Sequence, residues 1–346
     1  MLQLWSRPVL AVGEVSYCWQ DVVLLALLTG RWTPLERDIR EGLACIRHAE
    51  EAGAEEPESA IDEFAAEFRY DRDLITAQET ETWLEQHGLE ASEWLEWARR
   101  EVLRREWAPQ IEALTHRYRA SPAEVAGAAA VDLLCSSRGR ELLMDLAQRA
   151  AANAALEEAG ETVAGGLSAE TADRILARLP GVDPADAFSR LENLARLDRG
   201  YARFRDIAPT AELIRRELEL GRLEWVRLDC RVLQFETEAL AREAVLCVRE
   251  DGLGVDQVAE SAHALVYEMR FYLGELDSEL QPRLLAAAPG ELVGPVAFEN
   301  RHALFLVLDK LLPDEQAPGL RKDIEGRAVA RAVTDQVNRR VRWLER

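Results

Sequence analysis

The sequence lacks several features that mark common classes of protein. Its five cysteines are scattered and include no Cys-x-x-Cys pair, so it predicts neither a disulfide framework nor a zinc site. The longest apolar run near the start, 22–28, is far too short to cross a bilayer. The segment 1–16 has no basic start, no continuous apolar core and no small-residue cleavage site. We therefore expect a cytoplasmic protein.

Positive charge is also scarce. The 346 residues carry a formal net charge of −21, and Lys310 and Lys322 are the only lysines. Because phosphate binding requires a basic surface, this balance argues against a nucleic-acid partner. An anionic membrane would repel the chain for the same reason. An acidic surface can attract basic peptides, but it also simply keeps a protein soluble.

Familiar catalytic motifs are absent as well. The sequence has no GxGxxG, P-loop, HExxH or GxSxG pattern, so we expect no cofactor and no metal. What is present is the composition of a globular protein, 48% hydrophobic with 30% charged residues. A chain of this length suits two or three domains rather than a single core.

The first two-thirds of the chain is predicted to be helical. Apolar residues recur at helical spacing through 14–108, and Thr76 with Glu79 matches the capping-box pattern of a helix start. Tryptophans at helical intervals are expected to lie in the core rather than in a ligand cage: Trp83, Trp94, Trp97 and Trp107. The segment 109–222 is also expected to be helical, with a glycine pair and a Pro-Gly break.

A weak internal echo links these two helical segments. The sequence of 48–53 is similar to that of 155–160, and 88–94 is similar to 181–188. The offsets between the copies differ, so a duplication would have lost residues in its second copy. Chance likeness between alanine-rich helices explains the echo equally well, and both explanations stay open.

The pattern changes at Leu223. Alternating apolar and polar residues in 224–235 predict a strand. The elements expected after it are helices at 237–249, 255–262 and 279–287, strands at 292–296 and 302–308, and a last helix at 319–344. The predicted fold class is therefore α+β, with a mostly helical first part, a four-stranded antiparallel sheet with helices, and a C-terminal helix.

The segment 290–310 carries the clearest resemblance. Its Gly-Glu-Leu-Val-Gly-Pro-Val turn, apolar strand and closing Leu-Asp-Lys resemble the end of a parvulin (PpiC-type) prolyl isomerase domain. The order of elements from 223 to 313 is similar to the parvulin order. Around 83–103, the Trp-Leu-Glu-Gln-His-Gly-Leu phrase and its following helix resemble the N-terminal region of SurA-like chaperones.

These resemblances imply a division into four segments. Residues 1–108 would be a SurA-like helical domain and 109–222 a second helical segment. Residues 223–313 would be the parvulin-like domain. The helix in 314–346 would then pack back on the helical domain.

The parvulin resemblance also implies a site, an apolar cup for proline flanked by two histidines. It aligns Arg231 with the first histidine and Ala303 with the second, so no catalytic residue is assigned. A shift by one residue would place Cys230 at the first position, and a register error would restore His302. The residues that the resemblance implies for peptide binding are Arg231, Leu233, Leu273, Leu280, Arg283, Leu284 and Ala303. The leucines among them also suit a plain core role.

Three shorter phrases, at 221–225, 249–252 and 341–344, are similar to PpiC-related proteins of ribosomal peptide (RiPP) maturation systems. This likeness implies a cytoplasmic protein that handles a precursor or unfolded peptide for a modifying enzyme. Three hypotheses follow. The chain is a non-catalytic or nearly inactive peptide-binding protein, an active prolyl isomerase that uses Cys230 and His302, or a scaffold subunit for the modifying enzyme.

Overall fold

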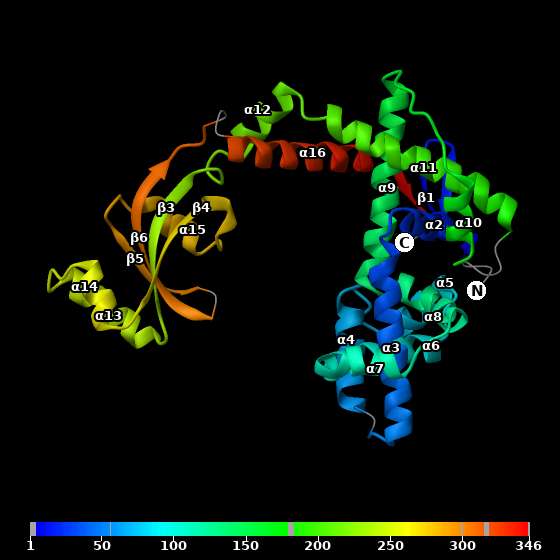
Figure 1. Cartoon of the computed structure of the whole chain (residues 1–346), viewed down its shortest axis with the longest axis horizontal. Helices are drawn as coiled ribbons and strands as arrows, with labels where there is room; N and C mark the ends of the chain where they lie inside the picture. Colours follow the sequence, from blue (N-terminus) through cyan, green and yellow to red (C-terminus); the bar gives the residue numbers. More distant parts are fainter. Residues whose placement is uncertain (1–4, 56, 179–182, 299, 315–317, 345–346) are drawn as a thin grey trace. The chain divides into compact units, whose positions relative to one another are not determined.

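The computed structural model describes residues 5–55, 57–178, 183–298, 300–314 and 318–344 (Figure 1). The chain divides into two compact units. The first, here the helical unit, comprises Met1–Ile207 and Ala332–Arg346, and the second, the sheet unit, comprises Ala208–Arg331. The α+β fold class is confirmed, whereas the finer division into four segments stays a prediction. No helix in the described ranges is both long enough and apolar enough to span a bilayer.

Besides a 3₁₀ helix (Ala108–Gln110) and the end of α16 (Pro318–Arg340), the helical unit contains ten α-helices among its described residues. They are α2 (Trp19–Leu28), α3 (Trp32–Ala52), α4 (Glu58–Tyr70), α5 (Ala77–His87), α6 (Ala91–Glu106), α7 (Ile111–Arg117), α8 (Pro122–Cys135), α9 (Ser137–Glu158), α10 (Ala169–Leu176) and α11 (Pro184–Ile207). The capping box at the start of α5 is confirmed. Thr76 Oγ1 accepts a hydrogen bond from Glu79 N at 3.2 Å, and Glu79 Oε2 accepts one from Thr76 N at 2.7 Å.

The core of this unit centres on α2. Eight of its ten residues are buried, which is the pattern of a helix covered on all sides. Trp94 and Trp97 are buried in the same core, and Trp83 packs against it. Trp107 packs in a neighbouring cluster with Ala44 and Leu103. The expectation that the tryptophans serve the core is therefore confirmed.

A three-stranded sheet in the helical unit corrects two expectations. The segment expected to be helical from residue 14 begins with β2 (Val15–Cys18), and the last helix, α16 (Pro318–Arg340), gives way to β7 (Val341–Trp343). Both strands pair antiparallel with β1 (Pro8–Val12). Three residues are too few to show a period, and the partner of β7 lies at the other end of the chain. Local sequence patterns therefore could not show this pairing.

The sheet unit contains a four-stranded antiparallel sheet in the order β4-β3-β6-β5. Its elements are α12 (Ala211–Leu220), β3 (Arg227–Phe235), α13 (Glu238–Arg249), α14 (Val255–Ser261), β4 (Leu265–Tyr272), a 3₁₀ turn (Leu273–Glu275), α15 (Leu280–Ala286), β5 (Leu292–Phe298), β6 (Arg301–Leu311) and the first part of α16. The strand β4 was not among the three strands located in the sequence, although a four-stranded sheet was expected. The other predicted elements of this unit are present within a few residues of their predicted bounds.

The two faces of this sheet are covered by different helices. Leu233, Phe235 and Leu304 pack against α13 and α14, and we call this side the α13 face. Cys230, Val232, Ala303 and Phe305 pack with Leu280 and Leu284 of α15, and we call this side the α15 face. This division follows from the period of two along each strand.

Candidate functional site

Two rows of side chains cross the α15 face of the sheet. Neighbours in the first row are Leu265, Gln234, Ala303 and Val296, and in the second row Tyr267, Val232, Phe305 and Val293. The central side chains are buried, with Ala303 and Phe305 both 0% exposed. The β4 end of each row is open to solvent, since Leu265 is 42% and Tyr267 45% exposed. The face therefore continues from the core to an exposed apolar rim.

The exposed rim lies on an edge strand. The strand β4 pairs with β3 on one side and ends the sheet order on the other. Its residues Leu265, Val266 and Tyr267 are all large, apolar and more than a third exposed, and we call these three the edge surface. An edge strand presents unpaired backbone N–H and C=O groups, which are a template for another extended chain.

The opposite end of the rows is shaped by a bulge in β5. The pairing of β5 with β6 shifts between Val293 and Val296. Gly294 lies in this bulge with a φ of +139°, and a Cβ there would come within 2.7 Å of the Ala303 backbone oxygen. Only glycine fits this close approach. The bulge brings Val296 beside Ala303, and the Phe298 ring packs edge-on against Phe305 at 5.3 Å.

The structure does not bring Arg231 and Ala303 together. Arg231 lies one residue from Cys230 along β3, so it points to the α13 face, where its guanidinium forms an ion pair with Asp256 of α14 at 2.7 Å. Leu233 lies on that same face, in the core under α13. Ala303 lies on the α15 face. The two positions aligned with the parvulin histidines therefore cannot form the walls of one cup in this register.

Cys230 and His302 are also separated by the sheet. Cys230 is 1% exposed on the α15 face, and burial raises the pKa of its thiol to about 11. A thiol with this pKa is neutral and a poor nucleophile at pH 7. His302 pairs across the strands with Phe235, whose side chain belongs to the α13 face. Because the sheet separates them, Cys230 and His302 do not form an acid–base pair.

The remaining candidates belong to the core or the surface of the sheet unit. Leu273, Leu280 and Leu284 are 3%, 5% and 0% exposed within one hydrophobic cluster. Of the two roles considered for these leucines, this burial favours the core. Arg283 is exposed on α15.

The positions of Gln234 and Tyr267 on the α15 face were not predicted from the sequence. Gln234, 6% exposed, is the polar side chain directly across from Ala303. Only the register between β3 and β6 reveals this position, and that register depends on a bulge between Asp229 and Cys230. Tyr267 was missed because β4 itself was missed.

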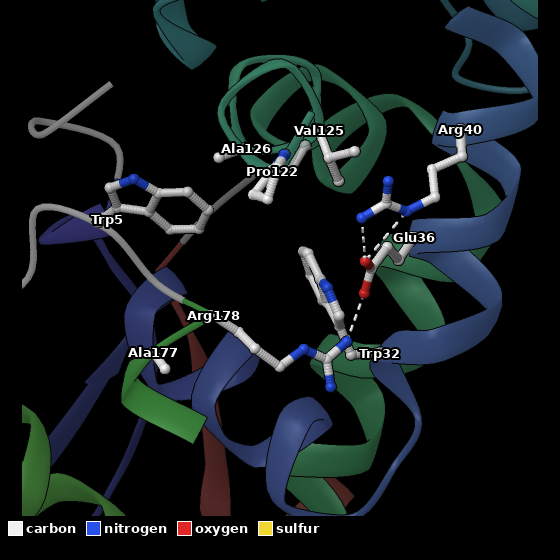
Figure 2. Close-up of a pocket in the computed structure, with 10 residues that line it drawn as sticks. Trp5, Trp32, Glu36, Arg40, Pro122, Val125, Ala126, Ala177 and Arg178 are labelled. Atoms are coloured by element: carbon white, nitrogen blue, oxygen red, sulfur yellow. Dashed lines mark hydrogen bonds and ion pairs between the residues drawn. The ribbon is translucent and has the colours of Figure 1, made fainter. Parts of the chain in front are cut away.

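A second candidate site is a cavity of about 170 Å³ within the helical unit (Figure 2). Trp32, Glu36 and Arg40 reach it from α3, because residues four apart lie on one face of a helix. The other residues around it are Trp5, Pro122, Val125, Ala126, Ala129, Ala177 and Arg178. Figure 2 shows the Glu36 carboxylate between the guanidinium groups of Arg40 and Arg178.

Hydrogen bonds keep the Glu36 carboxylate ionised. Arg40 Nη2 donates to Glu36 Oε1 at 2.7 Å, and Arg178 Nη2 donates to the other carboxylate oxygen. Burial alone would raise the pKa of Glu36, but these hydrogen bonds and the two positive charges outweigh burial, so the pKa is lowered. The cavity is thus apolar on its α8 side and charged at its α3 end.

Comparison with known proteins yields little likeness. No protein-family model matches the chain, and no curated protein matches it either. One solved structure with a similar chain comes from Campylobacter jejuni, where the virulence factor PEB4 and the periplasmic protein Cj1289 are described as two structurally related SurA-like chaperones. The alignment has 9% identity and covers 60% of this chain and 89% of that chain. Its TM-score is 0.19, which is too low to carry an argument about fold or function.

Proposed function

We propose that this chain is a parvulin-like peptide-binding protein with little or no prolyl-isomerase activity. It binds an extended apolar segment along β4. The observation that carries this proposal is the edge surface, three consecutive large apolar side chains on a sheet edge with which no other described strand pairs. Soluble proteins usually blunt such an edge with lysine, proline or a covering segment, because it otherwise recruits other chains.

The physical basis of binding is strand addition. An extended peptide beside β4 would form main-chain hydrogen bonds with the open edge of the sheet. Its alternate side chains would pack against Leu265 and Tyr267 on the α15 face, and the others against Val266 on the α13 face. Main-chain bonding accepts many sequences, so the apolar contacts supply the selectivity. This mode suits a protein that holds unfolded or precursor peptides.

The active-isomerase hypothesis has less support. Cys230 is buried with a raised pKa, and His302 belongs to the opposite face of the sheet. Isomerisation needs no nucleophile, but it does need a desolvated pocket that holds the twisted amide, whose rotation barrier is about 18–20 kcal/mol. We therefore expect turnover near background on X-Pro peptides.

The cellular setting in this proposal comes from the sequence likeness to PpiC-related proteins of ribosomal peptide maturation. The peptide would be a ribosomally made precursor, held in the cytoplasm for its modifying enzyme. We expect the gene neighbourhood of this chain to contain a short precursor gene and a modifying-enzyme gene. Their absence would contradict this setting but not peptide binding itself.

Binding to the edge surface can be tested with a labelled, apolar, strand-forming peptide and fluorescence anisotropy. We expect Tyr267→Ala to weaken binding about tenfold, because interface energy concentrates in buried aromatic side chains. Leu246→Ala is the matched control, because Leu246 is 56% exposed on α13 of the same unit. Equal affinity of the Tyr267→Ala variant and the unchanged chain would overturn strand addition at β4.

The catalytic part of the proposal has its own assay. The unchanged chain and the His302→Ala variant are compared on a panel of X-Pro peptides. We expect both to give the uncatalysed rate. Turnover well above background that falls in the His302→Ala variant would establish the isomerase hypothesis instead.

A further inference from the structure

The cavity in the helical unit combines an apolar pocket with a positively charged end. Its apolar side is formed by the indole rings of Trp5 and Trp32 and by the α8 side chains Pro122, Val125 and Ala126 (Figure 2). Its volume of about 170 Å³ is close to that of an engineered cavity of about 150 Å³ that holds a benzene ring. It therefore has room for one branched aliphatic side chain or one aromatic ring.

The charged residues around this cavity are unbalanced. Among the described residues that line it, two guanidinium groups, Arg40 and Arg178, face one carboxylate, Glu36, which leaves one excess positive charge. This local excess contrasts with a chain whose net charge is −21. Charge complementarity therefore indicates a ligand with one negative group beside its apolar part.

The two arginines differ in how many of their N–H groups already donate a hydrogen bond to the described residues. Arg40 donates through Nε and Nη2 to Glu36 and through Nη1 to the Ala120 backbone oxygen. Arg178 forms one hydrogen bond with the described residues, from Nη2 to Glu36, and its side chain is 42% exposed. Its Nε and Nη1 donors face no acceptor among those residues. Arg178 is therefore the residue that can donate hydrogen bonds to the carboxylate of a ligand.

We propose that this cavity binds the C-terminal residue of a peptide. The apolar side chain of that residue fills the cavity, and its α-carboxylate accepts hydrogen bonds from Arg178. A free amino acid fits less well, because its ammonium group would be repelled by the two guanidinium groups, whereas a peptide-linked residue has none. The edge surface lies in the other unit, so each of the two binding proposals survives failure of the other.

The carboxylate can be tested with one pair of ligands. Acetyl-Ala-Ala-Leu with a free carboxylate and the same tripeptide with a C-terminal amide are titrated into the full chain, with binding heat and tryptophan fluorescence as readouts. We expect the acid to bind at least tenfold more tightly than the amide, since hydrogen bonds to charged groups are the strong ones. Equal affinity for both ligands, or no binding of either, overturns the proposal.

Two variants separate the charge from the cavity. Arg178→Gln should reduce the affinity for the acid to that for the amide, and Ala126→Trp should weaken the binding of both ligands by filling the space. Arg117→Gln is the matched control, because Arg117 is an exposed arginine paired with Glu51 away from the cavity. Circular dichroism checks that each variant is folded. An Arg178→Gln variant that still prefers the acid overturns the assignment of the carboxylate to Arg178.

Discussion

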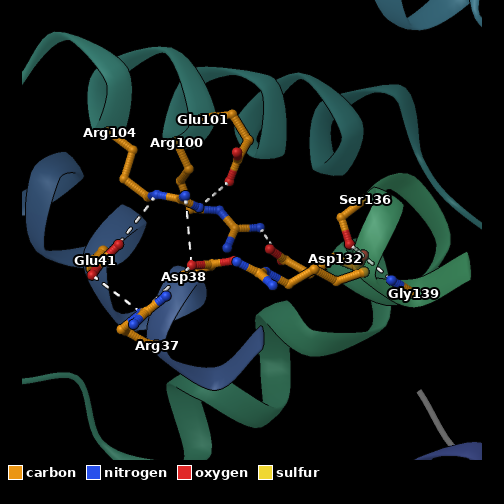
Figure 3. A network of polar contacts seen from close by, with 10 residues as sticks. Arg37, Asp38, Glu41, Arg100, Glu101, Arg104, Asp132, Ser136 and Gly139 are labelled. Carbon is orange, nitrogen blue, oxygen red and sulfur yellow. Dashed lines mark hydrogen bonds and ion pairs between the residues drawn. The ribbon is translucent and has the colours of Figure 1, made fainter. Parts of the chain in front are cut away.

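Arg100 of α6 and Asp132 of α8 form an ion pair that is almost completely removed from water. The distance from Arg100 Nη2 to Asp132 Oδ2 is 2.8 Å, and the two side chains are 4% and 3% exposed. Figure 3 shows this pair inside a wider polar network that includes Asp38 and Arg104. Burial raises the pKa of Asp132 to about 6, although the charge and hydrogen bond of Arg100 act to lower it. The pair therefore costs much desolvation energy for the attraction it gains.

Removal of Arg100 should consequently destabilise the chain in a pH-dependent way. We expect Arg100→Met to lower the free energy of unfolding by about 3 kcal/mol at pH 8, because it leaves a buried carboxylate without its partner. Without Arg100 the folded pKa of Asp132 rises further, so Asp132 binds its proton at pH 5 and the loss shrinks there. Urea unfolding at both pH values measures the difference.

Two control variants accompany Arg100→Met. One replaces both members of the buried pair, and the other breaks an exposed ion pair. Arg100→Met with Asp132→Leu should recover most of the stability, since apolar residues often replace a buried ion pair without loss. Glu157→Gln breaks an exposed pair with Arg196 and should change the free energy of unfolding by less than about 1 kcal/mol. An Arg100→Met variant that is as stable as the unchanged chain at pH 8 would contradict this account.

Single positions also show what the sequence can predict and what it cannot. The absence of imidazoles at Arg231 and Ala303 was readable from the sequence. The face to which each points was not, because the side-chain period of a strand is two and a bulge after Asp229 shifts the register. For the same reason, only the structure shows that Gln234 lies opposite Ala303.

At the scale of elements, the start of α8 is held by a capping box whose charge is sensitive to pH. Glu124 accepts hydrogen bonds from the Ser121 hydroxyl and backbone N–H, both at 2.7 Å, and pairs with Arg47. The Ser121 side chain is the main cause of a lowered pKa for Glu124, to about 2. A carboxylate with a lowered folded pKa stabilises the fold fully above its ordinary value of 4.5 and progressively less as the pH falls toward 2.

Glu124→Gln tests this contribution, because glutamine keeps the capping geometry and removes only the charge. We expect the variant to have a melting temperature about 2 °C lower than that of the unchanged chain at pH 7. The difference should decrease as the pH falls from 4.5 toward 2, because the unfolded chain binds a proton at Glu124 in this range before the folded chain does. Glu79→Gln at the equivalent position of α5 serves as a second capping box, in which no described arginine pairs with the carboxylate. A pH-independent difference would contradict the role of the charge.

Elements with strong local signals were predicted correctly. The capped helices, the strand β3 and the strands β5 and β6 have periodic patterns and turn residues at their ends. The strand β4 has an unbroken apolar start and exposed residues on both faces, so it shows no alternation of period two. The strand that carries the proposed peptide edge was missed because an open edge does not bury one face.

At the scale of the whole molecule, chain length predicted more than one domain and the residue patterns predicted an α+β fold, and the structure divides into two compact units. Composition could not predict where a peptide would bind. The net charge of −21 acts at this scale too, because the summed field of the chain reaches an approaching peptide before any contact forms.

This field should steer basic peptides toward the chain. One apolar, strand-forming core is prepared with lysine, serine or glutamate flanks, and association rates are measured by stopped-flow fluorescence. At low salt we expect the lysine-flanked peptide to associate about tenfold faster than the glutamate-flanked one. At 1 M salt the Debye length falls to about 3 Å, so the rates should converge on that of the serine-flanked control. Equal rates for the lysine and glutamate peptides at low salt would show that the acidic surface serves solubility alone.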